Sequence, residues 1–233
     1  MHPCTLPPEI TAQLVARRGR RHVFDHLVPA QTALVVIDMQ EMFTRPGAPR
    51  EVPIAREIVP AINRAADGVR AAGGTVAWVR SHFPRGARDW TSYFDHLNPG
   101  AAGDVVRDGL EHDAPLYALS EGLTPGAGDL HADKDRYSAF LPGASDLPDM
   151  LRSRGIDTIL IAGTLTNVCC ESSARDAMMT NFRAVMLADA NATRSDAEHM
   201  GALVTMALSF GDVQTVDEAL GYLAAGTAAP TPG

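Results

Sequence analysis

Solid apolar runs that alternate with amphipathic stretches most constrain what this chain can fold into. Segments 33–37, 158–162 and 184–188 are almost wholly apolar, and strands of this kind are buried on both faces, as in parallel sheets. Segment 54–71 carries apolar residues at spacings of three and four, which predicts an amphipathic helix that ends at Gly73. The alternation predicts an α/β fold with three α/β/α layers around a central parallel β-sheet.

The rest of the chain continues this pattern, with one long interruption. Strands are predicted over 75–79 and 213–216, and helices over 144–154, over 168–180 and after the capping box 195–198. Segment 81–131 is rich in Gly, Pro, Asp and His and predicts a long loop region, which in compact domains is often functional. Ligands of parallel sheets bind beyond the carboxyl ends of the strands, so we expect the chemistry there.

The two ends of the chain differ from its middle. Residues 1–30 are interpreted as an N-terminal arm, 31–225 as one folded domain and 226–233 as a flexible tail. The basic run 17–21 fits a contact with an anionic ligand or partner, or a solvated or subunit-packing arm. So short a run favours the second interpretation.

Charge and composition exclude several classes of protein. The chain has 20 Lys and Arg against 28 Asp and Glu, a net charge of −8, and no long basic cluster, so we expect no nucleic-acid binding. It has no apolar stretch long enough to span a membrane and no apolar core of a signal peptide, which predicts a cytoplasmic protein without a membrane partner. Three cysteines are too few for a disulfide framework.

A carboxylate and two thiols follow apolar runs of the predicted sheet. Asp38 directly follows the run 33–37. Partial desolvation there would make it a plausible general base, although a capping or loop-ordering role fits its position equally well. Cys169 and Cys170 follow the run 158–162 and fall in the first turn of the next helix.

The position of these cysteines has chemical consequences. We expect Thr166 or Asn167 to cap the helix, whose first N–H groups and dipole would stabilise a thiolate, lower its pKa and hold an oxyanion. Neighbours on a helix point about 100° apart. One of the two cysteines is therefore expected to be a packing residue, and spacing does not decide which one faces the site.

Three segments together resemble the isochorismatase-like cysteine hydrolases. They are Leu34–Gln40 (LVVIDMQ), Lys134–Phe140 (KDRYSAF) and Gly163–Ala177 (GTLTNVCCESSARDA), and their order and spacing match that family. The similarity extends over about residues 30–220, and the branch it is most similar to is that of the ureidoacrylate amidohydrolases and N-carbamoylsarcosine amidohydrolases.

The resemblance implies a catalytic triad of Asp38, Lys134 and Cys169, which leaves the second cysteine to packing. It also implies a cis peptide between Thr164 and Leu165, with the backbone amides of Leu165 and Cys169 forming an oxyanion hole. Without the resemblance, a lysine flanked by two aspartates is more typical of a solvated surface pair.

The metal prediction also follows from the resemblance, whereas the substrate contacts are predicted from their position in the chain. Nicotinamidases of this family bind a metal through an Asp and several His near the second strand, where this chain has RSHF (80–83) and no Asp-x-His pair. His96, His112 and His131 are scattered without ligand spacing, so neither a metal nor another cofactor is expected. Substrate contacts are assigned to Gln40, His82, Trp90, Tyr137 and Asn167, with Tyr93 and Phe94 as further candidates for the pocket wall, although packing or capping roles fit them as well.

The resemblance thus implies a cysteine-dependent amidohydrolase that acts on carbon–nitrogen bonds other than peptide bonds. It would cleave a linear amide or ureido bond of a small molecule through a thioester or carbamoyl-enzyme, release ammonia or an amine, and form a homo-oligomer, a dimer or tetramer. Isochorismatases proper lack the cysteine, so their vinyl-ether hydrolysis is not expected. A hydrolase of a cyclic amide or antibiotic lactam and a non-catalytic binding protein on the same fold are the alternatives. A redox protein built on the cysteine pair is disfavoured by helical geometry.

Overall fold

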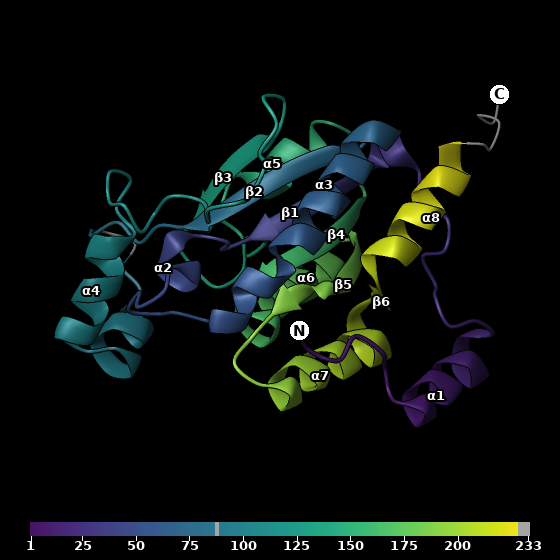
Figure 1. Cartoon of the computed structure of the whole chain (residues 1–233), viewed down its shortest axis with the longest axis horizontal. Coiled ribbons are helices and arrows are strands. Elements are labelled where there is room, and N and C mark those ends of the chain that lie inside the picture. Colours follow the sequence, from purple (N-terminus) through teal and green to yellow (C-terminus); the bar gives the residue numbers. More distant parts are fainter. Residues whose placement is uncertain (87–88, 228–233) are drawn as a thin grey trace.

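A six-stranded parallel sheet in the order β3-β2-β1-β4-β5-β6 forms the centre of the computed structural model, which describes residues 1–86 and 89–227 (Figure 1). Its strands are β1 (Thr32–Ile37), β2 (Thr75–Ser81), β3 (Leu130–Lys134), β4 (Thr158–Thr164), β5 (Arg183–Ala192) and β6 (Asp212–Gln214). The predicted fold class is confirmed.

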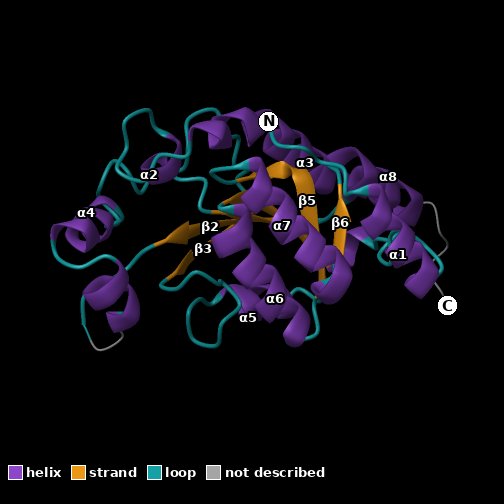
Figure 2. Cartoon of the chain, turned by 90° about the horizontal axis from the view of Figure 1, so that it is seen from below, coloured by secondary structure: helices purple, strands orange, loops and turns teal. Residues whose placement is uncertain are grey.

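Helices cover both faces of this sheet (Figure 2). The α-helices are α1 (Pro8–Arg18), α2 (Glu41–Thr44), α3 (Val59–Ala72), α4 (Ala101–Gly109), α5 (Leu147–Arg152), α6 (Glu171–Met179), α7 (Asp196–Thr205) and α8 (Val216–Thr227). Shorter turns are the 3-10 helices η1 (Pro29–Gln31) and η2 (Pro53–Ile58), and the π-helices η3 (Ser92–Leu97), η4 (Thr166–Cys170) and η5 (Met206–Phe210). No helix in the described ranges is both long and apolar enough to cross a membrane.

The central strands β1 and β4 are almost wholly apolar because each face of the sheet meets a layer of helices. Along β1, Val35 and Ile37 belong to the core cluster that includes residues of α5 and α6. Leu34 and Val36 belong to the cluster that includes residues of α3 and α8. Side chains alternate between faces along a strand, so two buried faces require the unbroken apolar runs seen in the sequence.

A third cluster lies beyond the carboxyl ends of β2 and β3, around α2, η3 and α4 (Figure 1). Its buried members are Met42, Phe83, Tyr93, Phe94, Val106 and Leu110. The prediction of one long loop over segment 81–131 is therefore wrong, because the segment contains η3, α4 and the first residues of β3. This cluster builds a wall over the end of the sheet where the functional residues lie.

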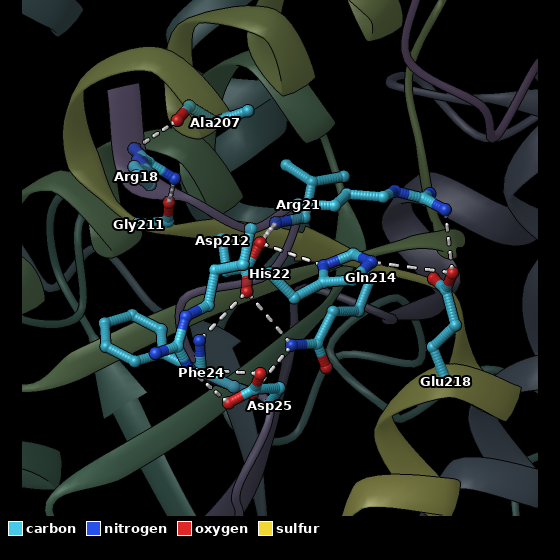
Figure 3. Close-up of polar contacts among 12 residues, drawn as sticks. Arg18, Arg21, His22, Phe24, Asp25, Ala207, Gly211, Asp212, Gln214 and Glu218 are labelled. Carbon is cyan, nitrogen blue, oxygen red and sulfur yellow. Dashed lines mark hydrogen bonds and ion pairs between the residues drawn. The ribbon is translucent and has the colours of Figure 1, made fainter. Parts of the chain in front are cut away.

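The N-terminal arm packs along the C-terminal elements of its own chain (Figure 3). Arg18 donates hydrogen bonds to the carbonyls of Ala207 (2.5 Å) and Gly211 (3.4 Å). Arg21 pairs with Glu218 at 3.2 Å. Part of the basic run therefore pairs with backbone and acidic groups of the same chain, while Arg20 is 58% exposed. The expected tail falls largely outside the described residues, since α8 continues to Thr227.

Gly163, near the end of β4, permits the close approach of β1 and β4. Its φ is +118°, and a Cβ there would lie 2.0 Å from the carbonyl oxygen of Ile37. We expect Gly163→Ala to lower the free energy of unfolding by about 1–3 kcal/mol from its backbone conformation, with a further cost from the clash. Urea unfolding measures it, and Gly201→Ala in α7 is the control, because nothing lies within 4 Å of a Cβ there. If the two variants were equally stable, the close approach of β1 and β4 would not depend on a glycine at position 163.

Candidate active site

Five consecutive strands of the sheet bring one functional side chain each to the same edge. Ser81 and Lys134 are the last residues of β2 and β3. Asp38 follows β1, Cys169 follows β4 within η4, and Arg194 lies two residues beyond β5. This is the edge at which parallel α/β sheets bind ligands.

A buried ion pair forms the base of the site. Lys134 Nζ lies 2.9 Å from Asp38 Oδ2, and the two side chains are 0% and 1% exposed. Ser81 Oγ donates to Asp38 Oδ1 at 3.0 Å and accepts a hydrogen bond from Lys134 Nζ at 2.8 Å. Asp38 Oδ2 faces the ammonium of Lys134 as an ion pair and makes no further hydrogen bond to the described residues.

Asp38 reaches the site through an uncommon backbone conformation. Its φ is +52°, in the left-handed region that aspartate adopts more readily than most residues. Its N–H donates to the carbonyl of Val79 in β2 at 2.9 Å. The chain therefore leaves β1 by a sharp turn at Asp38, directly beside the end of β2.

Cys169 is buried beside this ion pair. Burial raises the pKa of Cys169 well above its ordinary value and the charge of Asp38 raises it further, while Lys134 acts in the opposite direction. The expectation of a lowered pKa at this position is therefore wrong, because burial and the charge of Asp38 raise it. Burial alone would lower the pKa of Lys134, but Asp38 and Cys169 more than offset this and raise it, so the lysine stays charged.

The turn that carries Cys169 differs from the predicted helix start. Residues Thr166–Cys170 form the π-helix η4, whose N-cap is Leu165, with no side-chain capping bond. Thr166 instead has its Oγ1 2.9 Å from His199 Nδ1, so the predicted caps Thr166 and Asn167 are wrong. The peptide between Thr164 and Leu165 is cis, as the family resemblance implies. Cys170 is fully buried in the core, in its expected packing role.

A cavity of about 220 Å³ opens above these groups. Asp38, Ser81 and Cys169 line its floor. Its walls combine apolar side chains with a few polar ones, among them Phe43, Phe83, Val106, Tyr93, Asn98 and Tyr137. A space of this size with few polar groups is suited to a small molecule.

Of the five side chains predicted to contact substrate, Tyr137 lines the cavity as the structure describes it. Gln40 is fully buried and instead joins elements: its Nε2 donates to the carbonyls of Ser81 (3.2 Å) and Tyr117 (3.1 Å). Asn167 Oδ1 accepts a hydrogen bond from Thr193 Oγ1 at 2.6 Å. Neither residue is among the described residues that line the cavity, so a substrate contact is not supported for Gln40 or Asn167.

The aromatic candidates for substrate contact fall into those that line the cavity and those that do not. Trp90 supports the wall from behind, with its ring 4.8 Å from that of Tyr93 and 4.7 Å from that of Tyr137. Phe94 packs in the third core cluster, whereas Tyr93 lines the cavity. His82 is turned away from the cavity, and its Nε2 lies 3.4 Å from Glu111 Oε2. Direct substrate contact is therefore not supported for Trp90, Phe94 or His82.

Two arginines of the cavity lining were missed in the sequence. Arg50 lies in the segment after α2 and donates to Asn98 Oδ1 at 2.5 Å. Arg194 is exposed at the cavity rim. The strand-end rule points to Arg194 once β5 is known to run to Ala192 rather than 188, whereas no sequence signal marks Arg50.

The fold and this site define an isochorismatase-like hydrolase, and the chain belongs to the isochorismatase family. The sequence model of the isochorismatase domain matches residues 32–218. The family prediction, and with it the hydrolase class, is confirmed.

Individual relatives agree with this assignment. The chain is 32% identical over 218 residues to ureidoacrylate amidohydrolase RutB of Methylobacterium radiotolerans, covering 84% of this chain and 81% of that protein. A cysteine hydrolase from Pseudomonas syringae pv. phaseolicola has a similar structure, with a TM-score of 0.72 and 31% identity over 86% of this chain and 95% of that one. N-carbamoylsarcosine amidase from Thermoplasma acidophilum shares the fold, with a TM-score of 0.65 and 24% identity over 80% and 97% of the two chains.

Proposed function

We propose that this protein is a cysteine-dependent amidohydrolase that cleaves a linear amide or ureido bond of a small molecule. The observation that carries the proposal is the buried thiol of Cys169 beside the Asp38–Lys134 ion pair at the floor of a small cavity. The names of the relatives, ureidoacrylate amidohydrolase and cysteine hydrolase, support the same reaction class.

The first half of the reaction uses Asp38 as general base. Asp38 Oδ2 takes the proton from Cys169 Sγ as the sulfur attacks the substrate carbonyl carbon. The backbone N–H groups of Leu165 and Cys169 stabilise the oxyanion. The protonated Asp38 then returns the proton to the leaving nitrogen, and ammonia or an amine departs from a thioester or carbamoyl-enzyme.

The second half regenerates the thiol. Asp38 takes a proton from water, which attacks the carbonyl carbon of the covalent intermediate, and the departing sulfur recovers a proton from the same carboxyl group. Lys134 holds its charge throughout, because it lies 2.9 Å from Asp38 and its pKa is raised by its neighbours although burial opposes this. It therefore orients the carboxylate without exchanging protons.

The charge of the cavity favours a substrate with a carboxylate. The charges of Asp38 and Lys134 cancel, while Arg50 and Arg194 add positive charge along the lining. Arginine binds carboxylates through two parallel hydrogen bonds. An acyclic ureido or carbamoyl acid such as ureidoacrylate therefore fits the site better than a neutral lactam.

We expect Arg194→Gln to raise KM for a carboxylate-bearing substrate by about 10–100-fold with a smaller change in kcat, since a hydrogen bond to a charged group is lost. Steady-state kinetics with ureidoacrylate and with a neutral amide measure this selectivity. Arg183→Gln, at the opposite end of β5, is the control and leaves KM unchanged. Equal losses on both substrates would contradict a carboxylate contact.

An ammonia-release screen tests the function itself. The panel contains ureidoacrylate, carbamoyl amino acids, biuret, nicotinamide and simple lactams. Turnover of the linear carbamoyl acids above the others supports the proposal. Preference for a lactam selects the cyclic-amide alternative, and no turnover of any compound by the folded protein favours a binding protein on this fold.

A further inference from the structure

Two histidines and an aspartate meet on the outer side of β2 and β3. His82 follows β2, Asp133 lies in β3, and His112 lies in the segment between α4 and β3. Each offers one ligand atom, and these atoms all lie within 4.8 Å of one another. The imidazole rings of His82 and His112 are stacked, with centroids 4.0 Å apart.

We propose that His82, His112 and Asp133 bind a divalent transition-metal ion of the Zn²⁺ class. Imidazole nitrogen and carboxylate oxygen are ligands that Zn²⁺ takes at about 2.0–2.2 Å, with water completing the coordination where fewer than four protein ligands are present. Contraction to those distances requires rotation of side chains. The side chain of His112 is 60% exposed and has room to turn.

The surroundings of Asp133 orient one of its oxygens toward the histidines. The hydroxyl of Tyr117 donates to Asp133 Oδ1 at 2.6 Å, while Oδ2 lies 2.8 Å from His112 Nε2. Hydrogen bonds of this kind fix metal-ligating carboxylates from outside the coordination sphere.

The charges around the cluster also favour a cation. Glu111 Oε2 lies 3.4 Å from His82 Nε2 and is positioned to supply a further oxygen. Arg80 is the nearby positive group, with its Nε 3.6 Å from Asp133 Oδ1 and its guanidinium over the ring of Tyr117. Arg80 therefore occupies the Oδ1 side, and the two carboxylates outnumber it.

This site is separate from the cavity of Cys169. Ser81 and Lys134 point into the active site, so His82 and Asp133, their neighbours in the chain, face the opposite way. The described lining of the cavity contains no imidazole. Since the N–H of His82 donates to the carbonyl of Lys134 at 3.0 Å, a bound ion would join the ends of β2 and β3 without touching substrate.

Titration of the metal-free full chain with Zn²⁺ tests the proposal. We expect one equivalent to bind, and saturating Zn²⁺ to raise the melting temperature, because the ion binds the folded state. His112→Ala is expected to weaken binding by about 10–100-fold or more while leaving the melting temperature of the metal-free protein unchanged. His131→Ala is the matched control and keeps full affinity, because His131 is an exposed histidine in β3, the strand that carries Asp133.

The same titration on Cys169→Ala separates this cluster from the thiol. One equivalent retained by Cys169→Ala and lost from His112→Ala supports the site. Loss from Cys169→Ala with retention by His112→Ala would place the ion at the nucleophile and overturn the proposal. The absence of saturable Zn²⁺ binding to the unaltered protein would also overturn the proposal. Neither result bears on the amidohydrolase assignment, which the ammonia-release screen tests.

Discussion

Cys169→Ala is expected to reduce turnover of the best substrate by about 10⁴-fold or more, since removal of a covalent nucleophile leaves only binding and oxyanion stabilisation. The folded protein should change little. The side chain of Cys169 is small, so its replacement by alanine leaves a small void that costs about 1 kcal/mol. Steady-state ammonia release measures the activity, and urea unfolding measures the stability.

Cys170→Ala provides the matched control for this loss. Cys170 is the adjacent residue of the same type and is completely buried in the core, so its loss costs stability but leaves turnover within a few-fold. Mass spectrometry of the unaltered enzyme with substrate should find the added mass on the peptide at Cys169. If Cys169→Ala kept turnover and Cys170→Ala abolished it, the nucleophile would be Cys170 and the assignment to Cys169 would be wrong.

The sheet could be predicted from the sequence because burial on two faces leaves a strong signal. The runs at the centre of β1, β4 and β5 are almost wholly apolar. The sequence did not predict β3, because this edge strand is short and its residues, LHADK, are mostly polar. A strand of this kind is recognised only through its partner β2, which is a long-range contact.

The residues of the proposed triad were predictable to the extent that each follows a strand or lies in a long motif. Asp38 and the cysteine pair satisfy the first condition, whereas Lys134 and the choice of Cys169 over Cys170 required the family resemblance. The pKa of Cys169 was not predictable, because the helix position is local whereas the burial and the charge of Asp38 come from the fold. The same limit applies to His82 and His112, which are 30 positions apart in the chain and are brought together by β3 and the segment before it.

The buried Asp38–Lys134 ion pair balances two large energies, the cost of removing both charges from water and their mutual attraction. Lys134 is the single lysine in the chain, and it is one of its most buried side chains. Its folded-state pKa is raised above the ordinary 10.5. Its contribution to stability is therefore complete below pH 10.5 and is lost only as the pH rises through the higher folded value.

Lys134→Met is expected to lower the free energy of unfolding by about 3–5 kcal/mol, because it leaves the buried carboxylate of Asp38 without a counter-charge. Turnover should also be lost, since the carboxylate loses its orienting partner. Arg45→Met is the control: Arg45 pairs with Glu41 at 2.9 Å but is 46% exposed, so its loss costs about 0.5 kcal/mol or less.

The double variant Asp38→Asn/Lys134→Met separates stability from catalysis. Replacing both members of a buried ion pair by neutral side chains is often neutral or stabilising, so we expect the double variant to regain most of the stability that Lys134→Met loses. Its turnover should stay absent, because no group remains to take the thiol proton. Urea unfolding of the four proteins in this cycle, together with ammonia release, measures both effects. A double variant as unstable as the sum of the single ones would show that packing, rather than the unpaired charge, carries the cost.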